Sequence, residues 1–181
     1  IESTGVHATL DETATLQAGA ALSGSLLQID QQAMREAGLI APEEEQRLFE
    51  DEYRVIKRPI IANALGKGAG VVENGFVVLV TSALSGDGKT FTCINLAMSI
   101  AREQDIDVVL IDADVRKPHI SSLFDAQEED GLLDFLDGSV SDVGLIELPT
   151  SMNGLSIIPA GTSKENSTEL LSSNRMLEFF E

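Results

Sequence analysis

Short apolar runs alternate with stretches of helical spacing along most of this chain. Apolar runs cover residues 76–80 and 108–111, and a mostly apolar run covers 155–158; each is too short for a typical helix. Short continuous apolar runs are typical of parallel strands buried on both faces. Because a helical stretch follows the first run, the pattern predicts an α/β fold with a doubly wound, mainly parallel sheet in three layers.

Helical spacing also precedes the first apolar run. A short helix is expected over 29–38, and a longer one starts after Pro42, where three glutamates fill the first turn. Pro59 is expected to end or kink this longer helix, because a proline disfavours helical backbone at the residue before it. Phe49, Tyr53, Ile56 and Ile60 recur at helical spacing and should form the face of this helix that packs in the core. Asp51, Arg54 and Lys57 are predicted to lie on the opposite, outward face.

Three more helical stretches follow. The stretch 89–102 is apolar nearly all round, so we expect it to pack between two layers. A short surface helix is expected over 131–136, and one or two more over 169–180.

Composition suggests a three-part organisation. Residues 1–27 contain no Lys or Arg and have no sustained period, so they are interpreted as a flexible N-terminal tail. Residues 28–66 form a helical extension, and 67–181 form the domain that carries the sheet. Glycines at 66, 68 and 70 provide a hinge between the last two parts.

The charge balance narrows the possible partners. A formal net charge of -18 argues against nucleic acid or an anionic membrane as the main partner. No apolar run approaches the length needed to span a bilayer, and a single cysteine, Cys93, fits a reducing compartment. We therefore expect a cytoplasmic protein that reaches a membrane only through a partner.

The strongest chemical signal lies between the first apolar run and the next helix. Residues 83–90 read Ala-Leu-Ser-Gly-Asp-Gly-Lys-Thr, which is the pattern of a phosphate-binding loop in its proper strand-to-helix context. Gly86 and Gly88 let backbone amides approach phosphate oxygens, Lys89 supplies a charge for the β and γ phosphates, and Thr90 offers a hydroxyl to magnesium. The expected nucleotide-binding residues are Ser85, Gly86, Asp87, Gly88, Lys89, Thr90 and Phe91.

A second signal follows the run at 108–111. Asp112 and Asp114 stand two residues apart at the carboxyl end of this predicted strand, where open α/β sheets bind their ligands. In extended chain the two carboxylates would point the same way. One could hold magnesium or its water shell, and the other could orient an attacking hydroxyl as acceptor or base.

These two segments together resemble the bacterial tyrosine kinases of capsule and exopolysaccharide export, whose fold is similar to the MinD/ParA group of P-loop ATPases. Other stretches resemble the exosortase-associated (XrtA-type) tyrosine autokinase branch: 52–59, 72–75, 82–84, 91–92, 94–97 and 168–171. A MinD/ParA-type ATPase carries a signature lysine early in its loop. Here that position is Leu84, which favours a kinase.

The resemblance implies an activity and a site. It implies ATP-dependent tyrosine autophosphorylation that regulates exopolysaccharide synthesis or export, with Lys89, Asp112 and Asp114 as catalytic residues. It further implies that Thr90 and Asp112 hold magnesium, and that ATP and Mg²⁺ are the cofactors. The alternatives are a MinD/ParA-like ATPase and a non-catalytic, nucleotide-switched binding module of a polysaccharide co-polymerase.

The resemblance also implies partners. A membrane polysaccharide co-polymerase would bring the protein to the inner membrane, and a homo-oligomer would form through the helix that carries Asp51, Arg54 and Lys57. The family's later acidic strand and tyrosine-rich tail have no counterpart here, so we expect the chain to be part of a longer protein. Of the remaining candidates, Tyr53 and Cys93 are expected to pack in the core, and His119 to lie in a surface loop.

Overall fold

The computed structural model describes residues 26–70 and 72–180. Residues 1–25 of the predicted flexible tail lie outside this description. Leu27, the last residue of that predicted tail, forms a parallel bridge with Thr150, and its backbone N–H donates to Pro149 O at 3.0 Å. The chain is therefore tied to the sheet from this point onward.

Helices and strands alternate over the described residues. In chain order they are α2 (Gln31–Glu36), η1 (Glu43–Glu45), α3 (Gln46–Ala64), α4 (Lys89–Ala101), β1 (Val108–Ile111), α5 (His119–Leu123), α6 (Leu132–Leu136), η2 (Val143–Leu145), β2 (Leu148–Pro149), β3 (Leu155–Ile158), α7 (Ser167–Leu170) and α8 (Arg175–Glu178). The helices predicted over 29–38 and 89–102 are confirmed as α2 and α4, and the segment 169–180 carries the second half of α7 and all of α8.

The sheet has the strand order β1-β3-β2. Two of the three predicted strands are confirmed, because β1 pairs in parallel with β3, with Val108 opposite Leu155. The short antiparallel strand β2 on the other side of β3 has no signal in the sequence, since it is two residues long and ends in Pro149.

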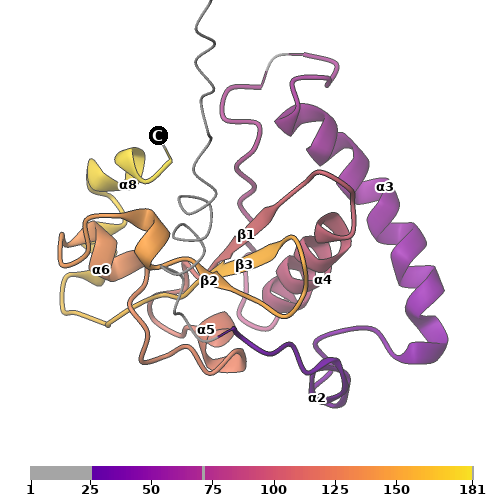
Figure 1. Cartoon of the computed structure of the whole chain (residues 1–181), viewed down its shortest axis with the longest axis horizontal. Coiled ribbons are helices and arrows are strands. Elements are labelled where there is room, and N and C mark those ends of the chain that lie inside the picture. The colour runs from indigo at the N-terminus through magenta and orange to yellow at the C-terminus, as the bar shows by residue number, and fades with distance from the viewer. Residues whose placement is uncertain (1–25, 71, 181) are drawn as a thin grey trace, which may run out of the picture.

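Helices cover both faces of this sheet (Figure 1). On one face, Leu110 of β1 and Ile157 of β3 pack with Ile94 and Met98 of α4. On the other face, Ile158 of β3 packs with Leu132, Phe135 and Leu136 of α6 and with Phe179, the residue after α8. Since α3 lies outside α4, the prediction that the helix at 89–102 packs between two layers is confirmed. The prediction of a surface helix at 131–136 is wrong, because every residue of α6 is buried.

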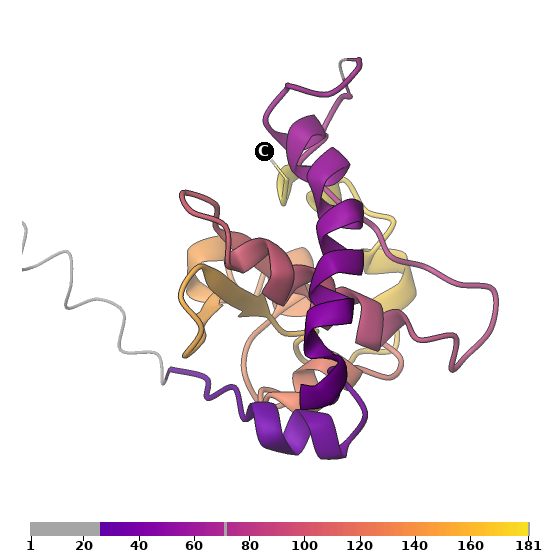
Figure 2. The same ribbon diagram turned by 90° about the vertical axis from the view of Figure 1, so that its right-hand side faces the viewer.

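The predicted buried strand at 76–80 is also wrong. Residues 77–82 follow no helix or strand pattern, and Figure 2 shows the connection between α3 and α4 as a long loop. Phe76, Val78 and Leu79 are 60%, 46% and 80% exposed. A strand exists only where a neighbouring strand accepts and donates its backbone hydrogen bonds, and within 26–70 and 72–180 none pairs with this run.

Pro59 does not end the long helix. It lies inside α3, which continues to Ala64. A proline in a helix leaves the carbonyl four residues earlier without its hydrogen bond. That residue here is Val55, which is 73% exposed, so water can reach this turn and satisfy the carbonyl.

The inward face of α3 differs in part from the prediction. Tyr53 is buried, and Phe49 and Ile60 pack beside it against Leu96 and Ile100 of α4, as predicted. Ile56, however, is 47% exposed.

Lys57, predicted to face outward, is only 8% exposed. The reason is that Lys57 follows Tyr53 by four residues, which places both on one helix face. Its ammonium group donates to Ser99 O at 2.6 Å and pairs with Glu103 Oε1 at 2.7 Å.

Candidate nucleotide-binding site

The glycines of the predicted phosphate-binding loop have the backbone that the motif requires. Gly86 and Gly88 have φ angles of 89° and 88°, a region that residues with a Cβ rarely adopt. Gly88 is also the N-cap of α4, so Lys89 and Thr90 occupy the first turn of a 13-residue helix. The exposed backbone N–H groups and the positive end of the helix dipole therefore meet at the loop, as an anion site needs.

Side chains inside the loop hold its shape. Lys89 Nζ donates to Ser82 Oγ at 2.9 Å, and Ser82 Oγ donates in turn to Leu84 O at 2.9 Å. Asp87 Oδ2 accepts from the backbone N–H of Leu84 at 3.0 Å. This chain of hydrogen bonds fixes where the lysine ammonium lies relative to the loop. Residues 82–84 belong to the stretches that resemble the XrtA-type kinases, but no motif in the sequence predicts that the Ser82 hydroxyl bonds to Lys89 and Leu84.

The two acidic residues after β1 lie in different environments. Asp112 is 2% exposed, whereas Asp114 is exposed and its carboxylate accepts from the backbone N–H of Lys117 at 3.2 Å. The expectation that both point the same way assumed extended chain, but β1 ends at Ile111, and the backbone N–H of Asp114 donates back to Asp112 Oδ1. The two carboxylates can therefore take different roles.

The carboxylate of Asp112 accepts hydrogen bonds from three donor groups of the protein. Ser121 donates to Asp112 Oδ2 through both its backbone N–H and its hydroxyl, each at 2.8 Å. The backbone N–H of Asp114 donates to Oδ1 at 3.2 Å. The Ser121 hydroxyl also accepts from the backbone N–H of Ala160, just beyond β3, at 2.9 Å. Sequence reasoning missed Ser121, because a lone serine in a short helix carries no motif.

Cys93 lies in the second turn of α4. Burial is the main cause that raises the pKa of its thiol, and the charge of Asp112 raises it further, while the charge of Lys89 lowers it. The geometry relates the two segments through α4, which begins at the loop and packs against β1, the strand that Asp112 directly follows. The raised pKa keeps Cys93 as a thiol, and it packs against the core as predicted.

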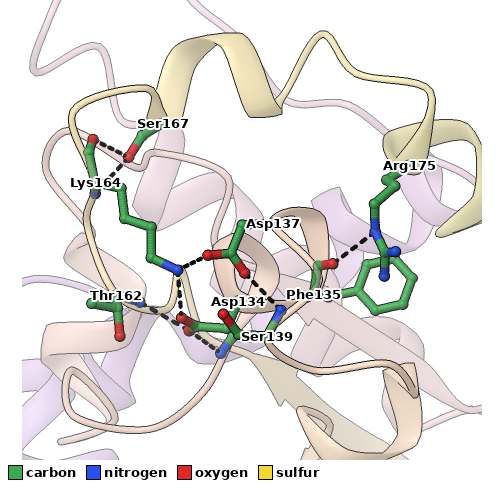
Figure 3. Close-up of polar contacts among 9 residues, drawn as sticks. Asp134, Phe135, Asp137, Ser139, Thr162, Lys164, Ser167 and Arg175 are labelled. Carbon is green, nitrogen blue, oxygen red and sulfur yellow. Dashed lines mark hydrogen bonds and ion pairs between the residues drawn. The ribbon is translucent and has the colours of Figure 1, made fainter.

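The loop after β3 borders the same end of the sheet and is fixed to α6. Asp134 is 3% exposed, and its Oδ2 accepts from the backbone N–H groups of Gly131 and Thr162, each at 3.0 Å. Lys164 pairs with Asp134 and with Asp137, as Figure 3 shows. These contacts are structural, because the carboxylates of this cluster are occupied by donors from the protein itself.

The remaining candidates stay away from this chemistry. Tyr53 is 8% exposed, and burial raises the pKa of its hydroxyl, so its predicted place in the core is confirmed. His119 is exposed and begins α5, one residue beyond the loop in which it was predicted to lie.

The residues at the loop suit magnesium held partly by a nucleotide. The Thr90 hydroxyl and the carboxylates of Asp112 and Asp114 are hard oxygen donors, which Mg²⁺ prefers. Over residues 26–70 and 72–180, no group of three or more His, Cys, Asp or Glu side chains could hold a metal. Magnesium sites of nucleotide enzymes usually combine one or two carboxylates with phosphate oxygens and waters.

A family model for the CobQ/CobB/MinD/ParA nucleotide binding domain matches residues 78–179, more than half of the chain. Within the part that the structure describes, no helix is both long and apolar enough to cross a membrane.

Curated relatives are tyrosine kinases of bacteria. The tyrosine-protein kinase YwqD of Bacillus subtilis is 34% identical over 140 residues, which cover 77% of this chain and 56% of YwqD. The tyrosine-protein kinase wzc of Salmonella typhi is 37% identical over 102 residues, which cover 56% of this chain and 14% of wzc. The chain therefore spans about half of one relative and a small part of the other.

Solved structures of kinase domains have the same fold. The BceF tyrosine kinase domain superimposes with a TM-score of 0.60 at 26% identity, over 93% of this chain and 69% of that domain. The VpsO kinase domain gives a TM-score of 0.56 at 31% identity, over 76% of this chain and 64% of that domain.

Proposed function

Because the chain belongs to the CobQ/CobB/MinD/ParA family of nucleotide-binding domains, we propose that it binds ATP with magnesium and serves a protein tyrosine kinase as its phosphoryl-transfer domain. One observation carries the proposal. A loop with the backbone of a phosphate-binding loop begins α4, and α4 packs against β1, the strand that the buried Asp112 directly follows. Relatives named as tyrosine kinases support the choice of reaction.

Each residue of the site has a part in this mechanism. The loop amides from Ser85 to Phe91 cradle the phosphates, and Lys89 leaves Ser82 to bind the β and γ oxygens. Magnesium, when bound with the nucleotide, neutralises charge that develops on the transferred phosphoryl group. Thr90 and Asp112 would hold the ion.

Burial separates the roles of the two aspartates. Asp112 is held by three hydrogen bonds and is 2% exposed, which suits a fixed ligand rather than a group that meets a protein substrate. Asp114 is exposed, so it can accept the hydrogen bond of an incoming tyrosine hydroxyl and orient it for in-line attack.

The phosphoacceptor must lie outside the described fold. Tyr53 is the single tyrosine of the chain and is 8% exposed, so its hydroxyl cannot reach Asp114 while the fold is intact. The proposed acceptor is a tyrosine of another segment of the full-length protein, on the same subunit or on a sister subunit. The role in exopolysaccharide export, the co-polymerase partner at the inner membrane and the XrtA-type branch remain predictions from the resemblance.

Oligomerisation through α3 needs a revised set of residues. Lys57 is engaged within its own subunit, whereas Arg54 and Asp51 pair on the exposed surface at 2.8 Å. Leu48 and Val55, 60% and 73% exposed, stand seven residues apart on the same face of this helix. We therefore assign the proposed interface to this outer face, and Val55→Asp should weaken self-association in sedimentation velocity.

Labelled ATP tests the proposal on the protein at its natural length. Wild type should accumulate label on tyrosine, and Lys89→Met and Asp114→Asn should abolish it. Asp125→Asn, which changes an exposed charge that is not among the proposed site residues, should not. Release of inorganic phosphate without phosphotyrosine would support the MinD/ParA-like ATPase instead. Nucleotide-dependent partner binding that survives Asp114→Asn without any phosphate chemistry would support the switched binding module.

A further inference from the structure

Ser121 joins the ends of two strands. It is 1% exposed in α5, and its hydroxyl donates to Asp112 Oδ2 at 2.8 Å, beyond β1. The same hydroxyl accepts from the backbone N–H of Ala160 at 2.9 Å, beyond β3. A serine hydroxyl has one proton to donate, and here that proton is committed to Asp112.

The two oxygens of Asp112 are satisfied unequally. Oδ2 accepts both the backbone N–H and the hydroxyl of Ser121 at 2.8 Å. Oδ1 accepts only the backbone N–H of Asp114, at the longer distance of 3.2 Å. A carboxylate oxygen has two acceptor positions, so Oδ1 keeps capacity for one more partner while Oδ2 is fully engaged.

We propose that Ser121 is a positioning residue for magnesium: it anchors Oδ2 of Asp112 and leaves Oδ1 to bind the ion or one of its waters. The inference rests on the proposed role of Asp112 in the nucleotide site. Residues that orient a metal ligand through its second oxygen commonly change metal affinity by tenfold or more when they are removed. A merely structural serine would change stability and leave the magnesium response as it is.

The neighbouring residue provides a matched control. Ser122 lies on the same helix, is exposed, and donates its hydroxyl to Pro118 O at 2.8 Å. Ser122→Ala therefore removes the same chemical group one residue away without touching Asp112. Ser121→Cys fills the buried space with a weaker donor, so it provides a second variant if Ser121→Ala fails to fold.

Two calorimetric measurements test this role. The first measures ADP binding in the presence of EDTA, and the second, in buffer without EDTA, titrates Mg²⁺ into the protein–ADP complex. Ser121→Ala should raise the Mg²⁺ concentration at half-saturation, the magnesium midpoint, at least about tenfold. The same substitution should change the dissociation constant for ADP in EDTA by a smaller factor. Ser121→Cys should raise the midpoint by less, and Ser122→Ala should match wild type. A folded Ser121→Ala, or in its place a folded Ser121→Cys, with a midpoint within about twofold of wild type would overturn the proposal.

Asp112→Asn separates this inference from the proposed function. If Asp112→Asn loses the magnesium response and the folded Ser121 variants keep it, the role of Ser121 alone is refuted. If Asp112→Asn responds to magnesium like wild type, the magnesium role of Asp112 fails, and the role of Ser121 fails with it.

Discussion

Replacing Lys57 by methionine tests the contact between α3 and α4. Lys57 is 8% exposed, donates to Ser99 O at 2.6 Å near the C-terminal end of α4, and pairs with Glu103 at 2.7 Å. Methionine keeps most of the apolar stem and removes the ammonium group. The helix carbonyl would lose its donor, and Glu103 would lose its counter-ion.

The size of the effect follows from these two contacts. A hydrogen bond to a charged group contributes about 1.5–3 kcal/mol, and an ion pair with a well-exposed partner contributes at most about 1 kcal/mol. The Glu103 side chain is 45% exposed, so the hydrogen bond dominates. We expect Lys57→Met to lower the free energy of unfolding by about 2 kcal/mol. Arg54→Met, which breaks an exposed pair with Asp51, should cost less than about 0.5 kcal/mol.

Urea denaturation at pH 7 measures both variants, with the free energy of unfolding extrapolated to water. Acid titration adds a second check, because Lys57 lowers the pKa of Glu103 below its ordinary 4.5. For an acid with a lowered folded pKa, the stabilisation is present above the unfolded pKa and is lost as pH falls through the folded value. The difference in the free energy of unfolding between wild type and Lys57→Met should therefore become smaller as the pH falls below the ordinary pKa of Glu103 and through its lowered pKa in the folded protein. A Lys57→Met variant as stable as wild type, or an equally costly Arg54→Met, would refute the reasoning.

Three further predictions concern packing and reactivity. Gly131→Ala should lower the free energy of unfolding by more than about 2 kcal/mol, because its Cβ would lie 2.3 Å from a backbone oxygen, whereas Gly70→Ala meets nothing within 4 Å; thermal unfolding compares them. Leu79→Asp should lower the free energy of unfolding measured in urea by less than about 0.5 kcal/mol, because Leu79 is 80% exposed. Leu110→Ala should lower it by about 2–5 kcal/mol, because Leu110 is 8% exposed. A large loss for Leu79→Asp would instead support the prediction of a buried strand at 76–80. Cys93 should react with iodoacetamide more slowly at pH 8 than a free thiol does, and its rate should keep rising at higher pH, because its pKa is raised.

The strands at 108–111 and 155–158 could be predicted because each run is mostly apolar, and Leu110, Leu155, Ile157 and Ile158 are buried against helices. The same criterion failed at 76–80, since apolarity measures a tendency to be buried, whereas a strand also needs a partner with free backbone groups. Sequence periodicity contains no information about that partner.

The failures at single residues have a related cause. Lysine is placed on a solvent face by default, but its four-carbon stem can pack while the ammonium reaches a distant acceptor, as Lys57 does 42 residues away at Ser99. The glycines and Lys89 of the loop could be identified because backbone conformation and phosphate chemistry demand those residue types at fixed spacing. Ser121 contacts Asp112 only because α5 folds back onto the ends of two strands, which no local pattern encodes.

Calorimetric titration of magnesium-ADP into the folded chain tests the central claim, that the loop ending at Lys89 is a nucleotide site. Wild type should bind one nucleotide per chain. Lys89→Met should bind none that can be measured, and Lys67→Met, which changes an exposed lysine outside the loop, should bind as wild type does. A folded wild type that binds no nucleotide, or a Lys89→Met variant that binds it equally well, would contradict the account.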